Sequence, residues 1–278
     1  RWIDEDETAL TLGADVTRAV LAKEHLTIRD IDLLLCCSGT PHFTTPSMAC
    51  LLLHALSQGK KDTLIQAYDI NAACSGYLYA LQIAFDYLQS RPQARILLVT
   101  TETLSRKVNR QDLATAPIFA DGASATVLYG DAHLDRLRAR LYRPIVAARG
   151  EDGRSLRVPL EANDGYVAMN GHRVFAEAVR KMILMLNRAC AEAGVTLDDL
   201  NVIVPHQANQ RIIDAIRKKI NVPEERVYSN IRYIGNTSSS SIPLCLERLL
   251  EERQPGDRLG LCAFGGGFTF GGAILQIV

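Results

Sequence analysis

The side chain with the most suggestive chemical setting is Cys74, in the segment Asp69–Tyr77 (DINAACSGY). An apolar run ends near Ile70, small residues make a tight turn, and a helical pattern begins near Ser75. A thiol at a helix N-terminus faces free N–H groups and the positive end of the helix dipole, which stabilise a thiolate. The same N–H groups bind a carbonyl oxygen as it becomes an oxyanion. The segment favours a nucleophile, with a buried packing thiol as the alternative.

Two further segments carry polar side chains that donate hydrogen bonds. His206, in Val204–Arg211 (VPHQANQR), follows a buried strand-like run and precedes a helical pattern. We expect it at the carboxyl end of a strand, where α/β proteins place their sites, and as a neutral Nε2–H donor, because a helix N-terminus disfavours the cation. Asn236, in Tyr233–Pro243 (YIGNTSSSSIP), has an amide that donates without changing charge. A core histidine and a capped serine-rich turn are the alternative interpretations.

A glycine-rich segment, Phe264–Gly272 (FGGGFTFGG), lies between strand-like runs. No helix follows it to receive a pyrophosphate, so it is not a dinucleotide-binding loop. Its glycines instead let the backbone approach another group closely and offer N–H groups to it. The other histidines and cysteines show no metal-ligand spacing, and the sequence predicts no metal site.

Composition excludes several classes of protein. Among 278 residues, Lys+Arg and Asp+Glu number 31 each, so no global field favours nucleic acid or an anionic membrane. Seven cysteines, most in apolar runs, indicate buried thiols in a reducing cytoplasm rather than a disulfide framework. The polar start Arg1–Glu7 is not a signal peptide, and no apolar run approaches the roughly 18 residues of a membrane span. We expect a cytoplasmic globular protein with neither nucleic acid nor membrane as a partner.

Strand-like runs alternate with helical patterns, which is typical of α/β proteins. The strand-like runs are Asp32–Cys37, Leu64–Ile70, Arg95–Thr100, Ala123–Tyr129, Asn201–Pro205, Asp257–Ala263 and Phe268–Val278. The helical patterns are Glu7–Lys23, Met48–Leu56, Gly76–Leu88, Val174–Ala193, Asn209–Lys219 and Ile242–Glu251.

The chain also shows an approximate internal duplication. Leu26–Leu35 (LTIRDIDLLL) matches Val195–Val204 (VTLDDLNVIV), and Arg95–Val99 parallels Arg258–Cys262, each pair before a glycine-containing strand. Chance similarity of α/β patterns is the alternative. A duplication predicts two halves, residues 1–150 with Cys74 and residues 151–278 with the histidine and asparagine. It also predicts two stacked sheets with helices between and outside them, and a site where the halves meet.

Four motifs together resemble β-ketoacyl-acyl-carrier-protein synthase III, a condensing enzyme of the thiolase superfamily. They are Ala73–Gly76 (ACSG), Val204–Asn209 (VPHQAN), Gly235–Ser238 (GNTS) and Phe264–Thr269 (FGGGFT). They occur in the order of that family and at nearly its spacing, and the resemblance covers practically all of the chain. Their joint occurrence is far more specific than any single motif.

The resemblance implies a five-layered α-β-α-β-α thiolase-like fold, a homodimer and a Cys-His-Asn site. Cys74 matches the nucleophile, while His206 and Asn236 match the pair that polarises the donor thioester. Gly266 matches the backbone donor that completes the oxyanion hole with the Cys74 N–H. The positions expected to bind substrate are Phe43, whose loop would reach the partner subunit, and Arg106, Asn209 and Arg211.

The activity implied is the condensation that begins fatty acid biosynthesis. An acyl-CoA loads Cys74, and decarboxylative Claisen condensation with a malonyl group on acyl carrier protein gives a β-ketoacyl product, with CoA and carrier thioesters as substrates and no cofactor. Two departures from the family are expected. The first strand that the family carries before the position of Arg1 is missing, and Glu161–Asn170, where pocket shape is often decided, is short.

Three other classes of function are the alternatives. A relative in secondary metabolism, or an acyltransferase without condensation, would need the same triad. A papain-like hydrolase fits the 132-residue separation of His206 from Cys74 (206 − 74) but not the residues around the cysteine. A non-catalytic subunit with this fold would not need all three side chains.

Overall fold

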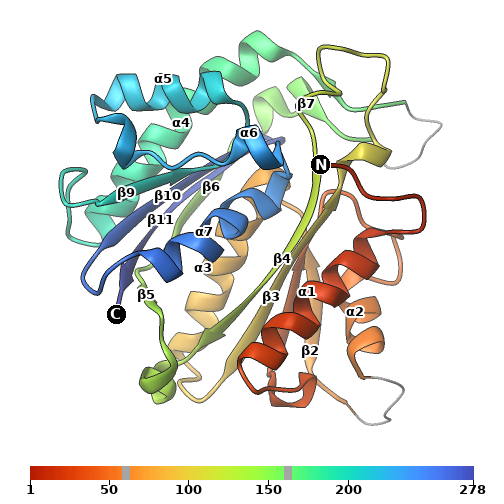
Figure 1. Ribbon diagram of the computed structural model, residues 1–278, viewed down its shortest axis with the longest axis vertical. Helices are drawn as coiled ribbons and strands as arrows, with labels where there is room; N and C mark the ends of the chain where they lie inside the picture. Colours follow the sequence, from red (N-terminus) through yellow and green to blue (C-terminus); the bar gives the residue numbers. More distant parts are fainter. Residues whose placement is uncertain (58–62, 160–164) are drawn as a thin grey trace.

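The computed structural model describes residues 1–57, 63–159 and 165–278 and contains two main sheets (Figure 1). The first has the order β2-β1-β3-β4, and the second the order β5-β11-β10-β9, with β6 also paired to β11. The strands of the first sheet are β1 (Leu33–Cys37), β2 (Gln66–Ile70), β3 (Arg95–Thr103) and β4 (Asp121–Tyr129). Those of the second are β5 (Ala139–Leu141), β6 (Ile145–Ala148), β9 (Val202–Pro205), β10 (Arg258–Gly265) and β11 (Thr269–Ile277). A separate hairpin pairs β7 (Leu156–Arg157) with β8 (Ala168–Met169).

Helices lie between the sheets and on their outer faces. They are α1 (Ala9–Lys23), α2 (Met48–Ser57), α3 (Gly76–Gln89), α4 (Gly171–Glu192), α5 (Gln210–Ile220), α6 (Ile231–Ile234) and α7 (Ser241–Glu252). Helices α3 and α7 occupy the middle layer, α1 and α2 cover the first sheet, and α4 and α5 cover the second (Figure 1). These five layers confirm the expected thiolase-like architecture.

The alternation of side chains along β1 shows how the apolar runs build these layers. Leu33 and Leu35 join the core between the two sheets, whereas Leu34 and Cys36 join the core under α1 and α2. Successive side chains of a strand point to opposite faces, so a strand buried on both faces is a continuous apolar run.

The internal duplication is visible in matching hydrogen bonds. The N–H and hydroxyl of Thr27 donate to Asp30 Oδ2 over 2.7 and 2.8 Å, and those of Thr196 donate to Asp199 Oδ2 over 2.8 and 2.8 Å. The first turn leads into β1 of the first sheet, and the second leads into β9 of the second sheet. The same short motif therefore positions β1 and β9.

The two halves differ from the expected division in one respect. Strands β5 and β6 precede residue 150, yet both pair with β11 and so complete the second sheet. Sequence patterns did not reveal them, or β7 and β8, because strands of two to four residues are too short to show alternation.

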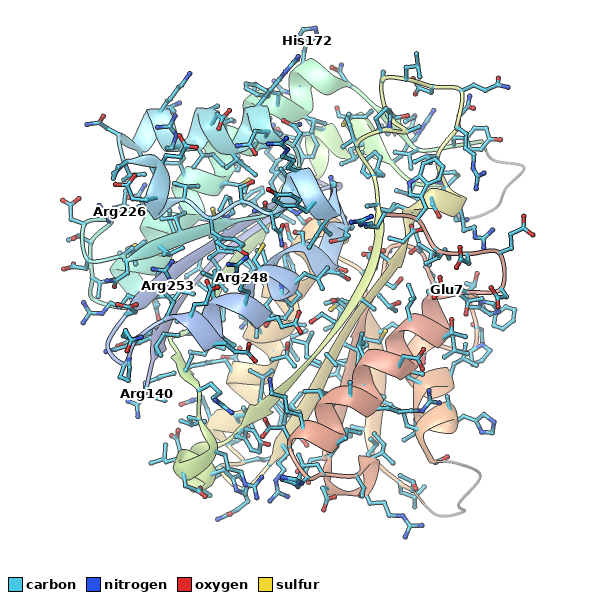
Figure 2. All side chains as sticks on the ribbon, in the orientation of Figure 1. Glu7, Arg140, His172, Arg226, Arg248 and Arg253 are labelled. Atoms are coloured by element: carbon cyan, nitrogen blue, oxygen red, sulfur yellow. The ribbon has the colours of Figure 1, made fainter. Side chains whose placement is uncertain are left out.

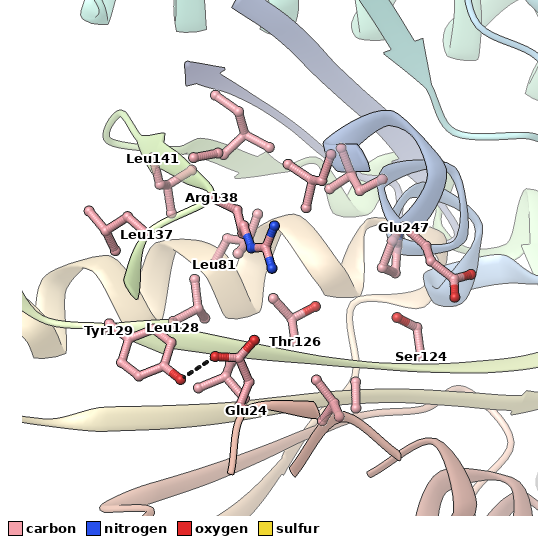
Figure 3. A pocket seen from close by; sticks show the side chains of 18 of the residues that line it. Glu24, Leu81, Ser124, Thr126, Leu128, Tyr129, Leu137, Arg138, Leu141 and Glu247 are labelled. Atoms are coloured by element: carbon pink, nitrogen blue, oxygen red, sulfur yellow. Dashed lines mark hydrogen bonds between the residues drawn. The ribbon is translucent and has the colours of Figure 1, made fainter. Parts of the chain in front are cut away.

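The outer edges of β4 and β11 are covered differently. Strand β11 is flanked by β5 and β6, while β4 is the last strand of the first sheet in the described part of the chain. A groove of about 510 Å³ lies beside β4, between α1, α3, β5 and α7, and Glu24 accepts a 2.8 Å hydrogen bond from the Tyr129 hydroxyl there (Figure 3). Its lining contains no cysteine, histidine or asparagine.

No helix within the described ranges is both long enough and apolar enough to cross a lipid bilayer.

Candidate active site

Cys74 lies in the short 3₁₀ turn η2 (Ala73–Ser75), between the end of β2 and the start of α3, and is 9% exposed. Its side chain lines a narrow cavity of about 40 Å³ together with His206 and Asn236. Apart from Asn209, the other lining residues are apolar: Ile118, Phe119, Leu156, Met169, Val174, Ala178, Met182, Ala208, Ile212 and Phe264. The structure thus brings the three expected side chains from the two halves to one cavity.

The Cys74 thiol is protonated at neutral pH in this setting. Burial raises the pKa of Cys74 to about 12, and the Glu102 carboxylate adds to the rise. The Ser238 side chain and the N–H of Cys74 itself act in the opposite direction on this pKa. Burial therefore opposes the thiolate that a helix N-terminus was expected to stabilise. The role of Cys74 as a nucleophile stays a prediction, and it requires that the sulfur lose its proton.

His206 follows the last residue of β9, and its N–H donates a 2.7 Å hydrogen bond to the Cys262 carbonyl on β10. Burial lowers the pKa of His206 to about 3, so the ring is neutral. Nδ1 lies 2.6 Å from Ser241 Oγ, which also accepts a 3.3 Å hydrogen bond from the N–H of Gln207. The Ser241 hydroxyl can therefore donate its own proton to Nδ1, which then acts as the acceptor. We accordingly assign the ring hydrogen to Nε2. The neutral state was expected, but its cause is burial rather than a helix N-terminus.

Asn236 is fixed by its backbone and by its own side chain. Its N–H donates to the Ile118 carbonyl over 3.0 Å, and its carbonyl accepts from the Ala120 N–H over 2.8 Å. Its Oδ1 accepts a 2.9 Å hydrogen bond from the Ser238 N–H. Because the oxygen is engaged, the Nδ2 group is the part of the amide that remains to donate.

The glycine-rich loop packs closely on the turn that carries Cys74. A Cβ on Gly265 would lie 2.7 Å from the Cys74 nitrogen, so only glycine fits there without displacement. The Thr269 hydroxyl donates a 2.7 Å hydrogen bond to the Ala72 carbonyl and ties the loop to the same turn. Gly266 lies next to this contact, and its role as an oxyanion donor stays a prediction.

Two of the expected substrate-binding residues lie outside the cavity. Phe43 is 51% exposed and packs edge-on against His42, with ring centroids 4.5 Å apart. The exposed Arg106 guanidinium donates to the carbonyls of Asp4 and Glu5 over 2.8 and 3.0 Å. Neither side chain lines the cavity of Cys74, and their substrate roles stay predictions.

The other two expected residues lie at the start of α5. Asn209 lines the cavity and caps the helix, its Oδ1 accepting a 3.0 Å hydrogen bond from the Ile212 N–H. Arg211 is exposed two residues further along. Part of the stretch expected to be short, residues 161–164, lies outside the described residues.

Three polar side chains of the site were not found from the sequence. Ser241 contacts the histidine, Ser238 contacts the thiol, and Glu102 is fully buried at the end of β3. A carboxylate inside the buried run Arg95–Thr103 was a usable signal, because such a charge is rarely buried without a role. The two serines were hidden in a run of four.

Within the described ranges, no group of three or more His, Cys, Asp or Glu side chains is placed to hold a metal ion. His172, at the start of α4, points away from the sheets at the edge of the molecule (Figure 2).

A five-layered duplicated fold with cysteine, histidine and asparagine around one narrow cavity defines a thiolase-like condensing enzyme. The family model for 3-oxoacyl-[acyl-carrier-protein (ACP)] synthase III matches residues 68–141, and the model for its C-terminal part matches residues 190–277. The chain belongs to the 3-oxoacyl-[acyl-carrier-protein] synthase III family and is a condensing acyltransferase of fatty acid biosynthesis.

Similar proteins match over nearly the whole chain. The β-ketoacyl-[acyl-carrier-protein] synthase III of Nitratidesulfovibrio vulgaris is 38% identical over 283 residues, covering 97% of this chain and 84% of the relative. The structure of the Aquifex aeolicus enzyme has a TM-score of 0.89 at 33% identity, covering 99% of this chain and 87% of that one. The priming β-ketosynthase of the R1128 polyketide pathway has a TM-score of 0.87 at 30% identity, covering 100% and 84%.

Proposed function

We propose that Cys74 takes an acyl group from acyl-CoA and that the acyl-enzyme condenses with malonyl-acyl carrier protein. The observation that carries this proposal is the common cavity of Cys74, a neutral His206 and Asn236. A thiol beside two uncharged donors suits a reaction that forms first a thioester and then an enolate.

In the first half-reaction, the Cys74 sulfur attacks the acyl-CoA carbonyl. The N–H groups of Cys74 and Gly266 are proposed to hold the oxyanion, and CoA leaves as its thiol. The closeness of the glycine-rich loop to the Cys74 turn supports this assignment. The apolar lining of the cavity suits the acyl chain.

In the second half-reaction, the malonyl thioester replaces CoA. Nε2–H of His206 and the Nδ2 group of Asn236 donate to its thioester oxygen as carbon dioxide leaves, which stabilises the enolate. With its pKa near 3, His206 is not a cation that would quench the carbanion by protonation. The carbanion attacks the acyl-Cys74 thioester, the sulfur leaves, and a β-ketoacyl-carrier product results.

Other parts of the proposal concern partners and location. Arg211, on the exposed side of α5 with Arg217, Lys218 and Lys219 in the last turn, offers positive charge to the phosphate of a carrier or CoA. Phe43 and Arg106 are proposed to bind substrate at the entrance. We also propose a homodimer, and the six buried free cysteines are in keeping with a reducing cytoplasm.

The test follows the two half-reactions separately. Intact-mass measurement reports acylation of Cys74 by a panel of acyl-CoAs, and labelled carbon dioxide reports decarboxylation of malonyl-carrier protein. Cys74→Ala should lose acylation. His206→Ala and Asn236→Ala should still be acylated but should lose about 10²–10³ in decarboxylation rate each, with overlapping effects because they act on one oxygen.

One result would favour the alternative of simple acyl transfer. If Asn236→Ala condensed at the wild-type rate, the decarboxylative step would be wrong for this chain. The product formed with an alcohol or amine acceptor would then define the reaction.

A further inference from the structure

Two side chains from opposite halves of the chain tie the glycine-rich loop to the turn that carries Cys74. The Thr269 hydroxyl, at the first residue of β11, donates a 2.7 Å hydrogen bond to the Ala72 carbonyl. In the other direction, the Ser75 hydroxyl donates a 3.0 Å hydrogen bond to the Thr269 carbonyl. The two bonds join the turn before and after Cys74, so they hold it on both sides. The two half-reactions use neither hydroxyl.

The side chain of Ser75 does not do what serine usually does at its position. Ser75 is the N-cap residue of α3, where serine is favoured because its oxygen accepts a hydrogen bond from an N–H of the first turn. The Ser75 side chain makes no such bond to α3. Its hydroxyl instead reaches across to β11, and the residue is 0% exposed. Helix capping therefore does not account for this serine.

The backbone of the turn is strained at the residue before the nucleophile. Ala73 has a φ of 47°, in the left-handed region that residues with a Cβ seldom adopt. Such a conformation persists only where the surrounding structure imposes it. The Ala72 carbonyl accepts from the Ser75 N–H over 3.1 Å within the turn, and from the Thr269 hydroxyl outside it. Because the Ala73 conformation sets the direction of the Cys74 N–H, these bonds also fix that N–H.

The Thr269 hydroxyl also contacts the loop that carries the other proposed oxyanion donor. Its Oγ1 lies 3.2 Å from the Gly266 carbonyl, and Thr269 is the partner of Gly265 where β10 and β11 pair. One hydroxyl is thus within hydrogen-bonding distance of both segments that supply the donors. An oxyanion site needs donors about 2.7–3.1 Å from one point, so the position of the two segments relative to each other is what counts.

We propose that Thr269 and Ser75 are positioning residues that hold the N–H groups of Cys74 and Gly266 at the spacing that binds the oxyanion of acyl transfer. Neither side chain lines the cavity of Cys74. They act through the two backbone segments that they join. This inference rests on the acyl transfer and the oxyanion site proposed above.

Two reactions of Cys74 separate placement of the donors from packing of the turn. Acylation by an acyl-CoA forms an oxyanion, whereas alkylation by iodoacetamide displaces iodide and forms none. Thr269→Val removes the hydroxyl and keeps the shape of the side chain. It should lower the maximal rate of acylation by about 10–10²-fold, because misplaced donors bind the oxyanion poorly. The half-saturating acyl-CoA concentration and the rate of alkylation, both followed by intact mass, should be unchanged.

Rescue and control variants accompany this substitution. Thr269→Ser keeps the hydroxyl and should restore acylation to near the wild-type rate. Ser75→Ala removes the reciprocal bond and should also slow acylation without slowing alkylation. Thr101→Val is the matched control, since the Thr101 hydroxyl donates a bond of the same 2.7 Å length to the Ala9 carbonyl, away from the cavity. It should lower Tm as much as Thr269→Val does and leave acylation at the wild-type rate.

Two results would overturn the proposal. One is acylation of Thr269→Val at the wild-type rate. The other is an equal fall in acylation and alkylation, which would mean that the hydroxyl only supports the packing of the turn.

A failure of the proposed function is recognised with p-nitrophenyl acetate, an activated ester whose attack by Cys74 also forms an oxyanion. A wild type that takes the acetyl group from this ester but no acyl group from CoA would contradict the proposed function. The comparison of Thr269→Val with Thr269→Ser would then be made with the ester, and slower acetylation of the valine variant alone would support the positioning role. A wild type that neither reagent acylates would contradict both.

Discussion

The Nδ1 atom of His206 lies 2.6 Å from Oγ of Ser241, the first residue of α7. Both side chains are buried, at 2% exposure each, so no water competes for this contact. Because α7 lies in the middle layer, the helix between the two sheets sets the orientation of the imidazole. The hydrogen bond also decides which nitrogen carries the proton, and the decarboxylation step proposed above requires it on Nε2.

Ser241→Ala should slow decarboxylation and spare acylation. Without the hydroxyl, both neutral tautomers become accessible, and the loss of one hydrogen bond corresponds to a rate decrease of about tenfold. Labelled carbon dioxide release and intact-mass acylation measure the two steps. Ser240→Ala is the matched control, since its hydroxyl donates to the Gly122 carbonyl instead. Equal slowing of both steps in Ser241→Ala would point to a disturbed α7 rather than to the tautomer.

The rate of decarboxylation should show no pH dependence due to ionisation of His206 between pH 5 and 8. The pKa of His206 is lowered to about 3 by burial, against an ordinary value of 6.5, so the ring stays neutral over this range. Between these two values the unfolded chain binds one more proton at this residue, so the free energy of unfolding falls as pH drops below 6.5. His206→Gln should lose less stability on acidification, measured by denaturant unfolding at pH 7 and 5. If the rate of carbon dioxide release changed near pH 6.5, and this change were absent from His206→Gln, the neutral ring would be contradicted.

Local patterns and the internal duplication predicted the two stacked sheets, because each half repeats the same hydrogen bonds. Asp32 Oδ2 accepts from the Arg95 N–H over 2.8 Å, and Asn201 Oδ1 accepts from the Arg258 N–H over 2.8 Å. The duplicated residues sit at equivalent strand starts, so similarity in sequence translated directly into similarity in structure. The central strands were predicted from continuous apolar runs, because a strand that is buried on both faces is apolar at successive positions.

The properties of the site depended on contacts that sequence spacing does not contain. The thiol was expected to be acidic because a helix follows it, but exclusion of water outweighs the dipole and raises the pKa of Cys74 to about 12. Glu102 and Ser238 come near Cys74, and Ser241 comes near His206, only through tertiary packing of elements far apart in the chain. Residue types and motifs predicted the three side chains that meet at the cavity, but they did not reveal the protonation state of the thiol.

The chain should form a twofold dimer through the edge of the first sheet. In the part of the chain that the structure describes, strand β2 is at the edge of that sheet. Three of its five residues are exposed, and Tyr68 is 40% exposed. An unpaired edge with an exposed aromatic side chain suits pairing with a second copy. Light scattering should give twice the chain mass of 30.6 kDa. Tyr68→Lys should weaken the dimer, whereas Tyr233→Lys, at an exposed tyrosine on α6, should not. An active monomer would refute the prediction.

Gly265→Ala should disable acylation by pushing the glycine-rich loop off the Cys74 turn. The added Cβ would lie 2.7 Å from the Cys74 nitrogen and 3.1 Å from the Ser75 nitrogen, and backbone atoms cannot rotate away as a side chain does. Overpacking of this kind costs about 1–3 kcal/mol in the free energy of unfolding, a lowering of Tm by several degrees for a chain of this size.

Acylation of Gly265→Ala should fall by more than about tenfold, because displacement of the turn moves the sulfur and the oxyanion donors apart. Thermal unfolding and intact-mass acylation measure the two effects. Gly150→Ala is the matched control, since its added Cβ meets nothing within 4 Å and should leave both quantities unchanged. If Gly265→Ala were acylated at the wild-type rate, close packing of the loop would not be what shapes the oxyanion site, and the assignment of Gly266 would lose its structural support.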